Sequence, residues 1–198
     1  MDKQKLIKEL CSLTEYPDDD SIHLKEKIKN VLLSNPALLF CLHNEKFEKE
    51  LFNEDGSINE TGDWSLYYGE NILPYYIIPE TQSKAAHYIC YKVEFDESPK
   101  YNKIDKYLNV TFVILCDNKD IIDNNTGVPR HDLIASIIRE MFNWSNYFGT
   151  QCHIVSEKEG LTDNNYATKT LVFECITTNS ITKTKEGKTS IINNEVWY

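Results

Sequence analysis

The sequence predicts an α+β fold, a two-layer sandwich in which helices cover one face of a mainly antiparallel sheet. Runs with apolar residues every three or four positions, typical of amphipathic helices, occur near the start and again at 131–143. Other runs alternate apolar and polar residues, as half-buried strands do. The order is two helices, an irregular segment, two strands, a helix and two strands, which favours two packed layers.

The first half of the chain contains the early helices. Two apolar faces repeat at helical spacing, one from Leu6, Ile7, Leu10 and Leu13 and one from Leu24, Ile28, Val31 and Leu32. Asn35-Pro36 interrupts the second run, after which we expect one or two further helical turns. Residues 45–85 are less regular, and "NEDGS" within them is a turn signal that indicates a hairpin tip.

The second half contains the predicted sheet. Alternation at 88–95 indicates one strand, and the more apolar Leu108–Cys116 indicates a central one. A polar loop at 117–128 leads into an amphipathic helix at His131–Asn143. Two strands follow, Cys152–Ser156 and Tyr166–Thr177, joined by a predicted loop at 157–165.

The length and composition predict one domain with an extension. A chain of 198 residues with 41% hydrophobic residues can bury a full core. The low glycine count, 7 residues, argues against long linkers. We therefore expect one domain over 1–177, with an irregular insertion near 45–85. Residues 178–198 are polar and end in an apolar pair, Trp197 and Tyr198. They are expected to form an arm or hairpin that docks on a neighbouring subunit.

The charge and the cysteines limit the function classes. A net charge of −10 argues against a surface that grips nucleic acid, which needs a basic patch. None of the six cysteines forms a CxxC pair, and four lie in strand-like runs, so we expect buried, reduced thiols. The start of the chain lacks a signal-peptide pattern, and no run is apolar enough to span a bilayer.

Several partial patterns for metal sites are present, and none is complete. His87 and Cys90 would point to opposite faces of a strand, so they are poorly placed to share one ion. Asp117, Asp120 and Asp123 lack the spacing and the closing glutamate of a calcium loop. A metal site whose ligands come singly from different helices and strands is left open, because one sequence does not show which residues meet in space.

Catalytic motifs are equally weak. Glu157, Lys158 and Glu159 resemble the acidic-x-lysine arrangement of metal-dependent nucleases, but consecutive residues of an extended chain face opposite sides. No GxSxG, P-loop or GxGxxG sequence occurs. We therefore expect a protein that is not an enzyme and needs no cofactor or metal.

Three segments carry a resemblance to a known family. "GTQCHIVSEKEGLTDNNY" corresponds to a short strand and turn, "KTLVF" to a last core strand, and "VLLSNPALLFCL" to an N-terminal helix entering a sheet. In these segments and in element order the chain resembles the tail-terminator and head–tail connector proteins of tailed bacteriophages. The resemblance covers residues 22–177 apart from 45–85.

The resemblance implies a structural role in the virion, at the tail top or in the neck, after assembly in the host cytoplasm. Such proteins form homo-oligomeric rings, often sixfold, that contact portal-side, neck or tail-tube proteins, and DNA only passes through their channel. No membrane contact is implied. The alternatives are a non-catalytic assembly or binding module acting as a monomer or dimer, and a metal-dependent nuclease.

If the chain forms a ring, loop 117–128, loop 157–165 and the arm 178–198 are expected to carry most intersubunit contacts. The candidate interface residues are Asp117, Asp120, Asp123, Arg130, Glu157, Lys158, Glu159, Asp163, Tyr166, Trp197 and Tyr198.

Overall fold

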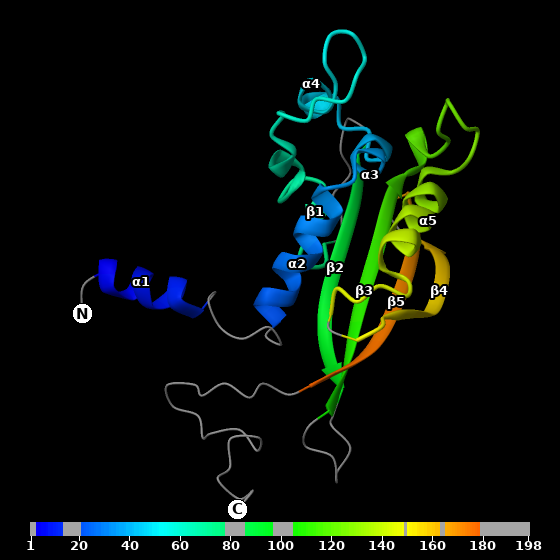
Figure 1. Cartoon of the computed structure of the whole chain (residues 1–198). Coiled ribbons are helices and arrows are strands. Elements are labelled where there is room, and N and C mark those ends of the chain that lie inside the picture. Colours follow the sequence, from blue (N-terminus) through cyan, green and yellow to red (C-terminus); the bar gives the residue numbers. More distant parts are fainter. Residues whose placement is uncertain are drawn as a thin grey trace, which may run out of the picture.

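The computed structural model describes residues 3–13, 21–77, 86–96, 105–148, 150–162 and 165–178. It shows a sheet covered on one face by helices, as the sequence predicted (Figure 1). The helices are α1 (Lys3–Leu13), α2 (Ser21–Leu33), α3 (Pro36–Cys41), α4 (Glu48–Leu51) and α5 (Arg130–Phe142), with short 3-10 turns at Glu45–Phe47, Trp64–Tyr67 and Asn118–Asp120. The strands are β1 (Ile72–Leu73), β2 (His87–Asp96), β3 (Asp105–Asp117), β4 (His153–Leu161) and β5 (Tyr166–Thr178).

The strands form one sheet in the order β1-β2-β3-β5-β4. All neighbours are antiparallel except β1, which pairs parallel to β2 through Ile72 and Ile89. The two long strands β3 and β5 occupy the middle of the sheet, which agrees with the apolar sequence of β3. The short β1 comes from the irregular segment and was not predicted, because two residues carry no recognisable period.

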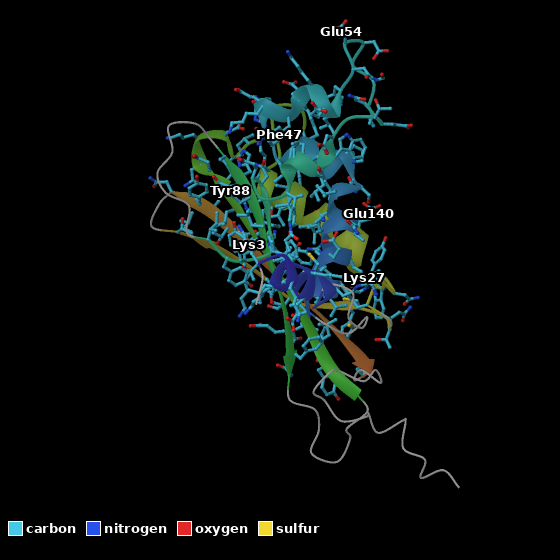
Figure 2. The ribbon with its side chains drawn as sticks, turned by 90° about the vertical axis from the view of Figure 1, so that its left-hand side faces the viewer. Lys3, Lys27, Phe47, Glu54, Tyr88 and Glu140 are labelled. Atoms are coloured by element: carbon cyan, nitrogen blue, oxygen red, sulfur yellow. The ribbon has the colours of Figure 1, made fainter. Side chains whose placement is uncertain are left out.

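The main core lies between the sheet and the helices. Phe112 of β3 is fully buried, and its ring centroid lies 5.1 Å from that of Phe142 on α5 and 5.7 Å from that of Phe173 on β5. Leu24, Ile28 and Leu32 of α2 and Ile134 and Ile138 of α5 join the same cluster. Figure 2 shows Lys27 of α2 and Glu140 of α5 on one side of the strands and Tyr88 on the other.

A smaller cluster lies on the face of the sheet away from the helices. It contains Leu73, Tyr88, Cys90, Leu115 and Tyr166. The rings of Tyr88 and Tyr166 lie 6.2 Å apart. The alternation of the strands therefore places apolar side chains on both faces, with the larger share toward the helices.

Two local signals in the first half are confirmed. Asn35 caps α3, because its side chain accepts a hydrogen bond from Leu38 N at 3.0 Å, and Pro36 occupies the first turn. Phe52 and Ile58 form an antiparallel bridge around the "NEDGS" turn. Gly56 has φ +81° there, in the left-handed region that glycine favours.

Two predicted boundaries were wrong. Strand β4 continues to Leu161, so Glu157, Lys158 and Glu159 pair with β5 and do not lie in a loop. The register shifts between Ile154 and Ser156, at a β-bulge. The helix ends at Phe142, one residue earlier than expected. Residues 179–198 lie outside the described residues, so the predicted arm stays a prediction.

The cysteines are free, and Cys90, Cys116, Cys152 and Cys175 are buried, as predicted. Among the residues that the structure describes, no helix is both long and apolar enough to cross a membrane.

Candidate functional site

The loop between β3 and α5 gathers four of the predicted interface residues at one end of the sheet. Asp117 ends β3 and caps the 3-10 turn, accepting a hydrogen bond from Lys119 N at 2.9 Å. Arg130 begins α5, and its guanidinium donates to Asp123 Oδ1 at 3.1 Å and to the carbonyl of Asp120 at 3.1 Å. Asp117, Asp123 and Arg130 are at most 5% exposed.

Asp123 holds this loop in place. Its Oδ2 accepts hydrogen bonds from the amides of Asn125 and Thr126 and from the Thr126 hydroxyl. Burial raises the pKa of Asp123, but these hydrogen bonds and the charge of Arg130 outweigh burial and leave the pKa below its ordinary value. The side chains of Asp117, Asp123 and Arg130 thus stabilise their own loop, and their part in a subunit contact stays a prediction.

Asp120 differs from its neighbours because its carboxylate meets two histidines. His43 Nδ1 lies 2.5 Å and His87 Nε2 lies 3.2 Å from Asp120 Oδ2. His43 follows α3, and His87 opens β2, so three separate segments supply the cluster. His87 is 1% exposed, whereas the side chain of Asp120 is 21% and that of His43 45% exposed.

Burial and neighbouring groups shift the pKa values of His87 and Asp120. Burial lowers the pKa of His87 more than the Asp120 carboxylate raises it. Burial raises the pKa of Asp120, but the contacts with both histidines and the charge of Arg130 bring it below the ordinary value. The arrangement favours a neutral imidazole beside a carboxylate, which is the form in which both groups bind metals.

A second charged cluster surrounds Lys169 of β5 on the helix face of the sheet. Its ammonium lies 2.5 Å from Asp132 Oδ1, 2.9 Å from Glu157 Oε1 and 3.2 Å from Glu159 Oε1. Arg139 of α5 also pairs with Glu157. The predicted interface residues Glu157 and Glu159 are therefore engaged in ion pairs within the chain that join β4 to α5 and β5.

Hydrogen bonding sets the ionisation in this cluster. The Lys169 ammonium, hydrogen-bonded to Glu157, holds the pKa of that carboxyl below its usual range. Burial lowers the pKa of Lys169, but the three carboxylates together raise it above its ordinary value. The shifts of Glu157 and Lys169 both favour the charged form of the side chain.

The remaining predicted interface residues differ in accessibility. Lys158 is exposed on β4. Tyr166 is buried against Tyr88, so its side chain serves the smaller core cluster. Asp163, Trp197 and Tyr198 lie outside the described residues.

An exposed apolar stripe on α1 was missed as an interface candidate. Leu6, Ile7 and Leu10 are 41%, 49% and 64% exposed and belong to neither core cluster. Figure 1 shows α1 standing apart from the sheet and from the other helices. The spacing of the apolar residues in 3–13 predicted the helix. It did not show that the apolar face of the helix is exposed.

Residues of α3, α4 and the neighbouring 3-10 turns line a shallow hollow on the surface. Its space of about 260 Å³ includes open solvent. Figure 1 shows α3 and α4 at one end of the sheet, away from α1. Its lining combines apolar and acidic side chains, namely Leu39, Phe40, Leu51, Phe52, Tyr67, Glu45 and Glu48, with His43 and Asn44.

The charges of these two features are opposite. Helix α1 carries three lysines and one glutamate, a net charge of +2. Residues 45–70 carry eight acidic side chains and two lysines, a net charge of −6. A basic, apolar helix and an acidic, partly apolar hollow are complementary surfaces.

Comparison with known proteins gives one family. A family model described as YomW matches residues 8–175, which is most of the chain. A search of curated proteins finds no match. This family is phage-derived, from the yom region of an SPbeta-like prophage, which suggests a phage protein. The chain therefore belongs to the YomW family.

Proposed function

We propose that this protein is a structural, non-catalytic component of a phage particle that assembles head to tail into a ring at the tail top or in the neck. The observation that carries the proposal is the exposed apolar stripe of α1. The phage-derived family and the two-layer fold, which gives a rigid ring subunit, support it.

The occupant that fits the α1 stripe is a second copy of this chain. An isolated helix of 11 residues is marginal in water, so α1 needs a surface to pack on. The hollow at α3 and α4 offers apolar side chains for Leu6, Ile7 and Leu10, and Glu45 and Glu48 for the lysines.

The positions of the two surfaces favour a ring over a dimer. Helix α1 and the hollow lie on separate parts of the molecule (Figure 1). A contact between different patches is heterologous, and it generates a closed ring when the rotation per subunit closes. A two-fold dimer would require two copies to exchange their α1 helices reciprocally, so that both contacts form within one pair.

The overall charge suits a channel around DNA. At a net charge of −10 the ring would repel phosphates, so DNA would pass without binding. We propose the ring as a tail terminator or head–tail connector, in contact with neighbouring neck, portal-side or tail-tube proteins in the virion. No membrane contact is proposed.

Light scattering of the purified full chain tests the assembly. The expected result is a mass that rises with concentration toward a multiple of 23.1 kDa, with rings in negative-stain images. Leu10→Glu should keep the chain monomeric. Ile22→Glu is the matched control, because Ile22 lies on α2 and is 48% exposed. A wild-type chain that stays at 23.1 kDa at every concentration would contradict the proposal.

A charge exchange tests the partner surface. Lys5→Glu with Lys8→Glu should weaken assembly, and so should Glu45→Lys with Glu48→Lys. Combining the four changes should restore assembly, because the charges are again opposite. If the combined variant stays monomeric while both parents fold normally by circular dichroism, the hollow is not the docking surface.

A further inference from the structure

We propose that His43, His87 and Asp120 form a binding site for a divalent transition-metal ion of the zinc class. One ring nitrogen of each histidine and an Asp120 carboxylate oxygen all lie within 4.8 Å of one another. They come from three segments that are far apart in the sequence, so no local motif brings them together. His43 also lines the proposed docking hollow, so metal binding has to be measured in the monomer as well as in the assembled chain.

The spacing is close to that of a coordination shell. Two ligands bound to zinc at about 2.0–2.1 Å in tetrahedral geometry are about 3.3 Å apart. His87 Nε2 and Asp120 Oδ2 are 3.2 Å apart. His43 Nδ1 lies closer, at 2.5 Å, and must move outward by less than about 1 Å. Its side chain is 45% exposed, so it has room to move.

The donor set selects the class of ion. Imidazole nitrogen suits zinc, cobalt, nickel and iron, whereas calcium and magnesium prefer oxygen ligands. Two histidines and one carboxylate leave an open coordination position, which water takes in three-ligand sites. The side chains of His43 and Asp120 are 45% and 21% exposed, which gives the ion a path of entry from solvent.

The local charge also favours a cation. Arg130 Nε lies 3.4 Å from Asp120 Oδ2, but its charge is matched by Asp123 at 3.1 Å. Asp120, Asp123 and Arg130 together carry −1. A divalent ion therefore enters a site with one uncompensated negative charge.

A second group of potential ligands does not support the same inference. His131, Asp132 and Glu159 also lie within 4.8 Å of one another. The Lys169 ammonium is already 2.5 Å from Asp132 and 3.2 Å from Glu159. Because this side chain supplies the cation for both carboxylates, a metal ion would have to displace it.

A bound ion would join the loop after α3, the start of β2 and the turn after β3. Metal binding stabilises a folded chain when the unfolded chain lacks the site. At a free zinc concentration of one hundred times Kd, the melting temperature should rise by about 5–10 °C.

Calorimetric titration of the metal-free full chain with zinc chloride tests the site, together with thermal melts. We expect one zinc ion per chain, with affinity reduced at least about tenfold in His43→Ala and in Asp120→Asn. His43→Ala is informative because a side chain that is 45% exposed contributes little to folding. His153→Ala is the matched control, since His153 lies on β4 and stacks on Trp144.

Cobalt chloride separates this site from the free cysteines. Cobalt bound by two imidazoles and a carboxylate gives visible d–d absorption without the charge-transfer bands of thiolate ligands. The same binding in the Leu10→Glu monomer would show that the site does not depend on the ring. The proposal is overturned if neither metal binds, or if binding survives both His43→Ala and Asp120→Asn unchanged.

Discussion

Helices α5 and α1 have the same kind of amphipathic sequence and opposite surroundings. In α5 the stripe of Ile134, Ile138 and Phe142 is fully buried against β3 and β5. In α1 the equivalent side chains Leu6, Ile7 and Leu10 are 41–64% exposed. The two helices are similar in length, 13 and 11 residues.

The difference shows what an apolar period specifies and what it leaves open. It specifies a helix and the face that must be covered, because burial of that face supplies most of a helix's stability. It does not specify whether the cover belongs to the same chain. For α5 the cover is the sheet, and for α1 we propose a neighbouring copy.

The largest effect on stability is expected for Ile138→Ala in α5. The change leaves a cavity in the main core and should lower the free energy of unfolding by about 2–5 kcal/mol. Urea unfolding of the monomeric Leu10→Glu background measures it without interference from assembly. A loss below about 1 kcal/mol would show that α5 is packed less tightly than its burial indicates.

The next effect is expected for Lys169→Met, which removes the ammonium that three carboxylates share. The side chain of Lys169 is 10% exposed and its partners are more exposed, so the expected loss is about 1–3 kcal/mol. Lys158→Met, on the same strand pair but exposed, is the control. Equal losses in the two variants would contradict a role for the cluster.

The same cluster predicts a pH dependence. The folded pKa of Glu157 is depressed, so its contribution is present above its unfolded pKa and is lost as pH falls through the folded pKa. The folded pKa of Lys169 is raised, so its contribution is present below its unfolded pKa and is lost as pH rises through the folded one. Urea unfolding across pH should show a plateau between these limits, and a steeper acid loss in wild type than in Lys169→Met.

A smaller effect is expected for Asn35→Ala, which removes the cap of α3. The loss should be about 1 kcal/mol, and Asn35→Asp should retain most of the stability because aspartate caps equally well. Because α3 lines the proposed docking hollow, the alanine variant should also weaken assembly. Unchanged stability in Asn35→Ala would mean that solvent replaces the cap.

The smallest effect on stability is expected for Leu10→Ala measured at protein concentrations below those of assembly, within about 0.5 kcal/mol, because the side chain is exposed in the monomer. The same change should weaken assembly, which light scattering measures. A loss of more than 1 kcal/mol in the monomer would place Leu10 in a contact within the chain.

The sequence was sufficient for elements with a long regular period. Helices α2 and α5 and the pairing strands β2, β3 and β5 were predicted, because burial of one face leaves a clear repeat. Strand β1 and the end of β4 were missed. Strand β1 has only two residues, too few to show a period. The end of β4 contains Glu157, Lys158 and Glu159, and three consecutive charged residues are typical of a solvated turn. In the structure, ion pairs with Lys169 and Arg139 neutralise the two glutamates.

The candidate site was less predictable than the fold. His87 was noted only for its sequence neighbour Cys90, whereas its contact in space is Asp120, 33 residues later. The carboxylates of the 117–128 loop were assigned to the surface because loops are usually exposed. Arg130 draws Asp123 inward, and a pair of this kind depends on tertiary packing.

Hydrogen–deuterium exchange of the assembled wild type and the Leu10→Glu monomer tests the central claim most directly. If α1 docks in the hollow of a neighbouring copy, the amides of 3–13 and of 45–52 should both be protected in the assembly and exchange faster in the monomer. The amides of α5 should be equally protected in both samples, as the internal control. Rapid exchange of α1 within a formed assembly would contradict the account.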